Sequence, residues 1–192
     1  MYRFICLLFI SLVSLPAHAG ENILTPYIGL TKWSDTSDFT VRGTSLSFDD
    51  SAETTFGFRY LYMFDSGLAI GADFYLYRMD VVNPIQADDA GVFHTHALVE
   101  YFFMPKESVS PFIGGGIGFS AIGFSGGVLD DDGSAGSSIE LNAGVQFRVS
   151  QRVGIQLEYK YTNFNMNENI DSLSTKIDST ANSFMLGVSI FI

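Results

Sequence analysis

The feature that most constrains this chain is a strict alternation of apolar with small or polar residues, clearest near the C-terminus. Between 153 and 162 the odd positions are apolar or aromatic and the even positions are small or polar. The two sets are Val153, Ile155, Leu157, Tyr159, Tyr161 and Gly154, Gln156, Glu158, Lys160, Thr162. A period of two is the signature of a β-strand with unlike faces. The chain is therefore predicted to consist of strands that separate two environments.

The alternation recurs and predicts eight strands, at 23–34, 53–64, 67–79, 92–104, 110–125, 138–149, 152–164 and 182–192. Short turns are expected at 65–66, 105–109 and 150–151. Long loops rich in Asp, Ser, Asn and Gly are expected at 35–52, 80–91, 126–137 and 165–181. An even strand number with short turns at one end and long loops at the other is typical of an antiparallel up-and-down transmembrane barrel. No helix or second domain is predicted.

Residues 1–19 are expected to be a secretory signal peptide, which leaves 20–192 as one barrel domain. Arg3 precedes an apolar run at 4–15, and Ala17-His18-Ala19 forms a small-x-small cleavage site. The run is shorter than the roughly 18 apolar residues of a spanning helix. The one cysteine, Cys6, lies within this segment, so neither disulfides nor thiol chemistry is expected in 20–192.

Two kinds of barrel fit this alternation, and they differ in the face that points inward. A soluble lipocalin-like barrel would enclose the apolar face, whereas a membrane barrel turns that face toward lipid. An eight-stranded interior is only just wide enough to be filled by side chains. The chain has 18 Phe and 9 Tyr, concentrated on the apolar face, while the other face combines glycines with a few charges. The bulky face is therefore predicted to meet lipid.

The glycine-rich run PFIGGGIGFS at 111–120 fits this architecture better than a phosphate-binding loop. Neither Gly114 nor Gly116 begins a G-x-G-x-x-G pattern, and no Lys-Ser or Lys-Thr follows. Gly114, Gly116 and Gly118 lie on the predicted inward face. Their missing side chains leave room there for large groups on neighbouring strands.

Charged residues on the predicted inward face are the candidate site. They are Arg59, Asp73, Glu100, Glu140, Arg148, Glu158 and Lys160, with Tyr75 beside them. An unpaired buried charge is costly, so these groups are expected to pair in a network across the lumen. The main interpretation is a structural plug, and the alternative is a gate in a narrow ion path.

No catalytic residue, metal site or cofactor is predicted. His94 and His96 share the inward face, but their spacing fixes no third metal ligand. The run DDDGS at 130–134 departs from a calcium loop because Leu141 occupies the place where Glu is needed. No Ser, His and acid set is singled out for nucleophilic catalysis.

Most of the acidic charge falls in the long loops. The net charge is −11, and the four loops hold 13 acidic residues against Arg42 and Lys176. The candidate interaction residues are Asp49, Asp50, Asp88, Asp89, Asp130, Asp131 and Asp132. These acidic loops would form an acidic rim at one end of the barrel. An acidic rim repels nucleic acid, although divalent cations can bridge it to the phosphates of lipopolysaccharide.

Aromatic residues are expected to form two interfacial girdles. Trp33, Tyr159 and Tyr161 lie toward the loops, and Tyr62, Phe64, Tyr101 and Phe103 lie toward the turns. Girdles of this kind mark the two membrane interfaces of a barrel.

The chain resembles the small outer-membrane barrel family that includes the transmembrane domain of outer-membrane protein A and the opacity-type surface proteins. The resemblance rests on Pro26-Tyr27-Ile28-Gly29, on the run at 111–118 and on the alternating last strand. The terminal residue departs from the family pattern, since Ile192 stands where Phe or Trp is usual.

The resemblance implies an integral protein of the Gram-negative outer membrane, inserted by the barrel-assembly machinery. Its termini are expected in the periplasm and its long loops outside the cell. The expected role is structural, or a surface interaction with an external ligand or with outer-membrane lipids and lipopolysaccharide. A small porin-like channel gated by the lumen charges is the alternative, and a lipid-modifying enzyme is the third possibility, because folds of this kind host all of these functions.

Overall fold

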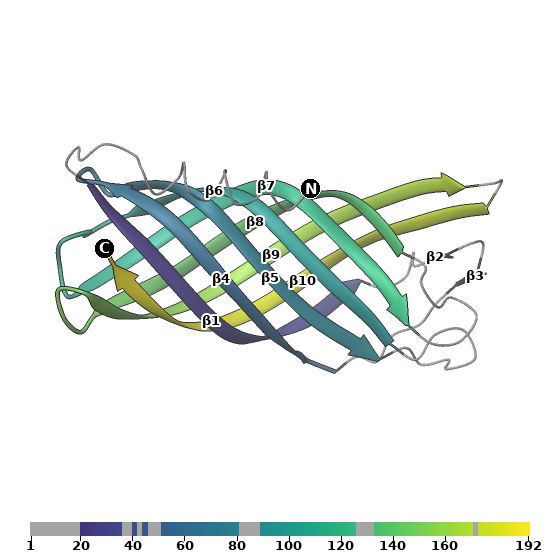
Figure 1. Cartoon of the computed structure of the whole chain (residues 1–192), viewed down its shortest axis with the longest axis horizontal. Helices are drawn as coiled ribbons and strands as arrows, with labels where there is room; N and C mark the ends of the chain where they lie inside the picture. Colours follow the sequence, from purple (N-terminus) through teal and green to yellow (C-terminus); the bar gives the residue numbers. More distant parts are fainter. Residues whose placement is uncertain are drawn as a thin grey trace, which may run out of the picture.

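The structure is a computed structural model that describes residues 20–35, 40–41, 44–45, 51–80, 89–125, 133–170 and 173–192. Eight long strands wind around one axis and close into a barrel (Figure 1). They are β1 (Gly20–Asp35), β4 (Glu53–Phe64), β5 (Leu68–Asp80), β6 (Asp89–Phe102), β7 (Val109–Ser125), β8 (Gly133–Arg148), β9 (Val153–Ile170) and β10 (Leu173–Phe191). The predicted fold class, an eight-stranded antiparallel up-and-down barrel, is confirmed.

Each long strand pairs antiparallel with its neighbours in sequence, and β1 closes the sheet against β10. Closure pairs the backbone groups that an open sheet would leave at its two edges, as a lipid-embedded sheet requires. Two strands of two residues, β2 (Thr40–Val41) and β3 (Thr44–Ser45), pair with each other, and β2 also pairs with β10. No helix of the described ranges is long and apolar enough to cross a membrane.

The two faces of the sheet follow the predicted alternation. Large apolar side chains cover the outside, with Ile117 71% exposed and Phe184 69% exposed, whereas polar and charged groups are buried within. A soluble barrel would have the opposite arrangement, with its apolar side chains enclosed. The outward apolar face therefore forms the belt that a membrane barrel presents to lipid.

The connections divide the barrel into two ends. The turn end carries the short connections at 65–67, 103–108 and 149–152 together with Gly20 and Ile192 (Figure 1). The loop end is the opposite one, where β1, β5, β7 and β9 end. At the turn end, Tyr62 packs edge-on against Phe64, and Tyr101 packs edge-on against Phe103. These outward rings form an aromatic band where the girdle toward the turns was predicted.

The predicted bounds are wrong at the loop end, where the strands run longer than expected. β6 begins at Asp89, β8 begins at Gly133, and β9 and β10 fill most of the predicted loop 165–181. The β9–β10 hairpin extends past its neighbours (Figure 1), because β8 pairs with β9 only as far as Asn165 and β1 pairs with β10 only as far as Thr180.

The polarity of the strands inverts at the loop end, which explains these missed bounds. In β9 the apolar side chains Phe164 and Met166 point inward, whereas Tyr159 and Tyr161 nearer the middle point outward. The same inversion places Trp33 inside the barrel, 8% exposed against Phe164 and Tyr77, so its predicted place in the outer girdle is wrong. Past the lipid, the barrel has a water-facing exterior and an apolar interior.

Candidate functional site

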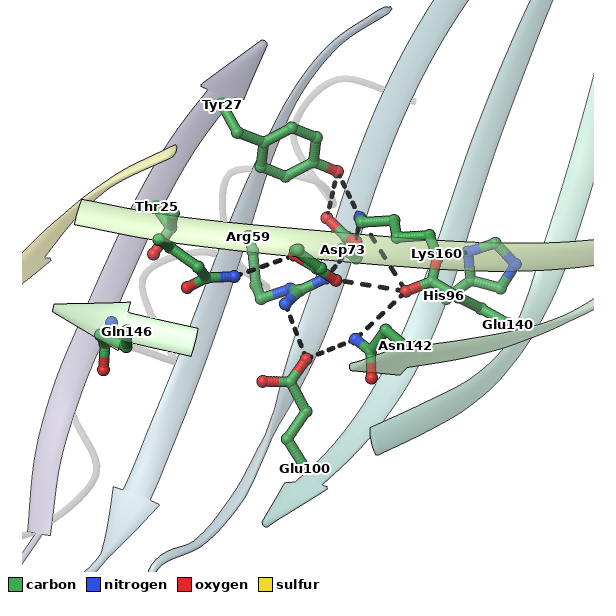
Figure 2. A network of polar contacts seen from close by, with 12 residues as sticks. Thr25, Tyr27, Arg59, Asp73, His96, Glu100, Glu140, Asn142, Gln146 and Lys160 are labelled. Atoms are coloured by element: carbon green, nitrogen blue, oxygen red, sulfur yellow. Dashed lines mark hydrogen bonds and ion pairs between the residues drawn. The ribbon is translucent and has the colours of Figure 1, made fainter. Parts of the chain in front are cut away.

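A layer of charged side chains crosses the middle of the lumen (Figure 2). We call it the charge layer, and it consists of Arg59, Asp73, Glu100, Glu140, Glu158 and Lys160. Five strands contribute to it, namely β4, β5, β6, β8 and β9, each through residues on its inward face. All six residues are at most 5% exposed.

Arg59 lies at the centre of the charge layer. Its Nη2 lies 2.9 Å from Asp73 Oδ2 and 2.6 Å from Glu158 Oε1, and its Nη1 lies 2.7 Å from Glu100 Oε1. Glu140 is more distant, with Oε1 3.7 Å from Arg59 Nη2. A guanidinium suits this position because its planar array of donors can serve several carboxylates at once.

Lys160 is the second cation of the layer, and it pairs with Asp73. Its Nζ also lies 2.9 Å from the hydroxyl oxygen of Tyr27 and 4.3 Å from the centre of that ring. The Tyr27 hydroxyl in turn donates to Asp73 Oδ1 at 2.6 Å. Asp73 therefore accepts from both cations and from a phenol, which makes it the best-compensated carboxylate of the four.

Glu140 contacts His96 on the side of the layer nearer the loop end. Glu140 Oε2 lies 3.2 Å from His96 Nδ1, and His96 Nε2 lies 2.9 Å from Ser138 Oγ. This Ser–His–carboxylate chain has the connectivity of a nucleophilic triad. Ser138 is only 3% exposed, however, so its hydroxyl cannot reach a substrate from the surface.

Uncharged polar groups complete the middle of the lumen. Asn142 Nδ2 donates to Glu100 Oε1 at 2.6 Å, and Gln156 Nε2 donates to Glu158 Oε2 at 2.9 Å. Ser189 Oγ lies 2.8 Å from Gln146 Nε2 and 3.0 Å from Thr25 Oγ1, and it donates to Gln156 Oε1 at 3.5 Å. Buried polar groups require such partners, and these contacts link the charge layer to β1 and β10.

Apolar side chains close the lumen on both sides of the charge layer. We call the group toward the turn end the turn plug, and it consists of Ile23, Leu61, Met63, Ala69, Leu98, Phe102, Phe112 and Phe191. The group toward the loop end, the loop plug, includes Trp33, Tyr77, Met79, Val92, Ile122, Phe124, Phe164, Met166 and Ile177. The charged groups thus lie between two apolar barriers.

Glycines on the inward face give these large side chains their space. A Cβ added at Gly114 would lie 2.5 Å from Glu100 Cγ and 2.6 Å from Asn142 Oδ1. A Cβ at Gly144 would lie 2.5 Å from the ring of Phe112 in the turn plug. Gly114 therefore has the role predicted for the run at 111–120, which is to leave room for large groups of neighbouring strands, whereas an added Cβ at Gly118 would meet the backbone of Thr95 and His96.

Arg148 is the one predicted lumen charge that the structure places elsewhere. It lies at the turn end, where its Nη2 is 2.6 Å from Glu21 Oε2 and its guanidinium stacks on Phe191 at 3.8 Å from the ring centre. A pocket of about 240 Å³ opens at this end, and Glu21 and Arg148 both line it. Sequence reasoning missed Glu21 because that residue precedes the predicted start of the first strand.

Of the seven candidate interaction residues in the predicted loops, the structure describes Asp89, which lies in β6 and not in a loop. Ser125 donates to Asp89 Oδ1 at 2.5 Å, and Arg78 Nη2 lies 2.5 Å from Asp89 Oδ2. The Ser125 hydrogen bond, together with Arg78, lowers the pKa of Asp89 below its usual value. Asp49, Asp50, Asp88, Asp130, Asp131 and Asp132 lie outside the described residues.

The two lumen histidines are held by protein groups. His94 Nδ1 lies 2.5 Å from Ser120 Oγ, its Nε2 lies 3.1 Å from the Tyr77 hydroxyl, and its ring stacks on Tyr75. Among the residues that the structure describes, no group of three or more His, Cys, Asp or Glu side chains is arranged to hold a metal ion.

The comparisons with known proteins agree with this architecture. The family model described as outer membrane protein beta-barrel domain matches residues 5–190. A search of curated proteins finds no match to the sequence.

Solved structures of small barrels are similar to this one. Neisserial surface protein A has 14% sequence identity and a TM-score of 0.64, with 88% of this chain and 96% of that chain covered. OprG from Pseudomonas aeruginosa has 15% identity and a TM-score of 0.62, with 91% and 96% covered. Ail, the attachment invasion locus protein of Yersinia pestis, has 19% identity and a TM-score of 0.57, with 91% and 100% covered.

At these identities the structural likeness shows the fold alone, whereas the family match extends over nearly the whole sequence. The closed sheet, the outward apolar face and the polar lumen are the features that such a family requires. The chain therefore belongs to the outer membrane protein β-barrel domain family.

Proposed function

We propose that this protein is a plugged barrel that anchors acidic loops at the outside of the Gram-negative outer membrane. The observation that carries the proposal is the sealed lumen, in which the charge layer lies between the turn plug and the loop plug. The barrel then serves as a rigid support, and interactions at the cell surface fall to the loops.

Burial of the charge layer favours a plug over a channel. A continuous aqueous path would leave the side chains along it in contact with water, yet Asp73, Glu140 and Lys160 have no exposed surface. The loop plug adds a second obstacle, because its aromatic rings pack against one another. We therefore propose that the barrel in this conformation conducts no ions.

The orientation in the membrane follows from the two ends. Short turns together with both barrel termini are typical of the periplasmic side, and long loops are typical of the extracellular side. Because the strands invert their polarity at the loop end, this end extends past the lipid into water. The acidic loops would then stand at the level of the lipopolysaccharide head groups.

Lipopolysaccharide, held through divalent cations, is the partner that best fits an acidic rim. Acidic loops and phosphate groups repel each other unless cations lie between them. Mg²⁺ and Ca²⁺ are bound by carboxylate oxygens and can bridge the two anionic surfaces. Two barrels of similar fold are named as a surface protein and an attachment protein, but our proposal rests on the loops and the lumen.

The loop proposal is tested by the binding of refolded protein to lipopolysaccharide vesicles with Mg²⁺ or with EDTA. We expect binding in Mg²⁺ and its loss in EDTA. A rim variant carrying Asp49→Asn, Asp50→Asn, Asp130→Asn, Asp131→Asn and Asp132→Asn should bind at least about tenfold more weakly, because the carboxylates that hold the cations are gone.

The matched control neutralises acids at the turn end, Asp65→Asn with Glu107→Gln, and should bind as the unmodified protein does. Binding that survives EDTA, or that is equal in the rim variant and the unmodified protein, would sink the loop proposal.

The rival functions find less support in the site. A channel gated by lumen charges would need both plugs to open together. A lipid-modifying enzyme would need a nucleophile at the surface, but the Ser138–His96–Glu140 chain is enclosed in the lumen. The protein is therefore proposed to have no enzymatic activity.

A further inference from the structure

The charge layer contains more acids than bases. Among the described residues, Asp73, Glu100, Glu140 and Glu158 face only two permanent cations, Arg59 and Lys160. Four ionised carboxylates would leave two uncompensated negative charges inside a sealed, low-dielectric lumen. Such charges are so unfavourable that the groups neutralise or take up a counter-charge.

The contacts distinguish the carboxylates that are well paired from those that are not. Asp73 contacts both cations and the Tyr27 hydroxyl. Glu158 contacts Arg59 through Oε1 and Gln156 through Oε2. Both oxygens of each carboxylate therefore have a donor, as ionised groups require.

Glu140 and Glu100 are less well compensated. Glu140 Oε1 lies 3.7 Å from Arg59 and 3.9 Å from Lys160, both longer than hydrogen bonds, and accepts only a long hydrogen bond of 3.5 Å from the uncharged Asn142 Nδ2. Its Oε2 lies 3.2 Å from His96 Nδ1, a ring nitrogen that can accept a proton. Glu100 Oε2 is buried without a hydrogen-bond partner among the described residues.

We propose that the charge layer is a proton-binding site that holds two protons at neutral pH, one on Glu140 and one on Glu100. The Glu140 carboxyl donates to His96 Nδ1, and His96 in turn donates from Nε2 to Ser138 Oγ. With both glutamic acids neutral, the two cations balance Asp73 and Glu158, and the sealed layer carries no net charge.

Protons fit this lumen better than a metal cation does. The side chains of the layer have almost no accessible surface, so a hydrated ion has no room between them. The described residues also include no acid and histidine cluster with metal-binding geometry. A proton needs no space, and Glu140 Oε2 and His96 Nδ1, which lie 3.2 Å apart and have no other hydrogen-bond partner among the described residues, can share one.

The charged and titratable groups that face the two glutamates come from five neighbouring strands. β1 contributes Tyr27, β4 contributes Arg59, β5 contributes Asp73 and Tyr75, β6 contributes His94 and His96, and β9 contributes Glu158 and Lys160. On β7 the facing residues are Gly114, Gly116 and Gly118, which bring no charge. The two cations therefore remain the only positive charges that the described residues contribute to the layer.

Infrared spectroscopy of the refolded protein tests the proposal directly. At about pH 8 an ordinary glutamate is ionised, so surface carboxylates give no protonated-carboxyl band. We expect a band from protonated carboxyl groups in the unmodified protein. Glu140→Gln should remove about half of it, and Glu107→Gln, which changes an exposed turn residue, should leave it intact. If the unmodified protein shows no such band, that result alone overturns the proposal.

The pH dependence of unfolding provides a second, independent test. The unfolded chain has released the protons that the folded barrel retains, so stability must fall as pH rises above the ordinary glutamate range. Between about pH 7 and pH 9, each retained proton should change the unfolding equilibrium about tenfold per pH unit. In Glu140→Gln one retained proton is gone, so the pH dependence should be weaker by one factor of about ten per pH unit. If Glu140→Gln and Glu107→Gln show the same pH dependence, the proposal is contradicted.

Discussion

At the scale of single residues, one guanidinium organises the interior. Arg59 contacts Asp73, Glu100 and Glu158 on three other strands, and no more than 1% of its surface is exposed. Its pairing with Asp73 follows directly from strand register, because the two residues are opposite each other on β4 and β5. The carboxylates from the opposite wall then reach the same group across the narrow lumen. Arg59 thus links strands that do not pair in the sheet.

Replacement of Arg59 should therefore be costly. In Arg59→Met the carboxylates lose their central partner while they stay buried, and we expect the free energy of unfolding to fall by about 3–5 kcal/mol. Urea unfolding of the refolded protein in lipid vesicles measures this change.

Arg78→Met is the matched control, because Arg78 pairs with Asp89 at the surface with its side chain 71% exposed. An exposed ion pair contributes only about 0–1 kcal/mol. Equal losses for the two variants would show that the charge layer contributes no more than a surface pair.

The alternation along a strand predicts on which face of the sheet a residue lies, but not its position along the barrel axis. The six residues of the charge layer occupy positions that the alternation assigned to the inward face, and all six are buried. The alternation assigned Arg148 to the same face. The predicted turn at 150–151 already placed Arg148 near the turn end, but its pairing with Glu21 on another strand depends on strand stagger and pairing register, which the alternation does not give. The contacts of Tyr27, Asn142 and His96 were missed for the same reason, although all three lie at inward positions.

At the scale of strands, the alternation depends on what surrounds the barrel as well as on the strand itself. Where lipid surrounds the barrel, apolar residues alternate outward, and these segments were predicted well. At the loop end water replaces lipid, so β9 turns Phe164 and Met166 inward and its polar residues outward. A loop was predicted at 165–181 because the outward positions after Tyr161 are no longer apolar, so the expected strand pattern ends there.

The tip of the β9–β10 hairpin should be dispensable for folding. Within the described residues, 167–170 pair only with 173–176, and Lys176 also pairs with Thr40 of β2. We expect that an Asn-Gly turn joining Met166 to Ile177, which are opposite each other, will preserve the barrel. Unfolding in urea should change by no more than about 1 kcal/mol, because no barrel pairing is lost.

A change lower in the same hairpin is the control. Phe164→Ala empties a fully buried position of the loop plug against Trp33 and should cost about 3–5 kcal/mol. If the shortened hairpin is destabilised as much as Phe164→Ala, the tip supports the barrel and our interpretation of the hairpin is wrong.

At the scale of the whole molecule, the barrel has three interior compartments and one continuous apolar exterior. The turn plug, the charge layer and the loop plug follow one another along the axis, and their side chains are buried. An eight-stranded barrel has little interior space beyond that. The shape and the filling are the basis on which we propose that the barrel supports surface loops.

The most direct test of the sealed lumen is a current recording from refolded protein in a planar lipid bilayer at high salt. Heat-modifiable gel mobility of the same sample would establish that the barrel has folded. We predict a silent membrane, because the plugs and the charge layer leave no water-filled path. Discrete, reproducible conductance steps from the folded protein would contradict the account and show that the lumen opens.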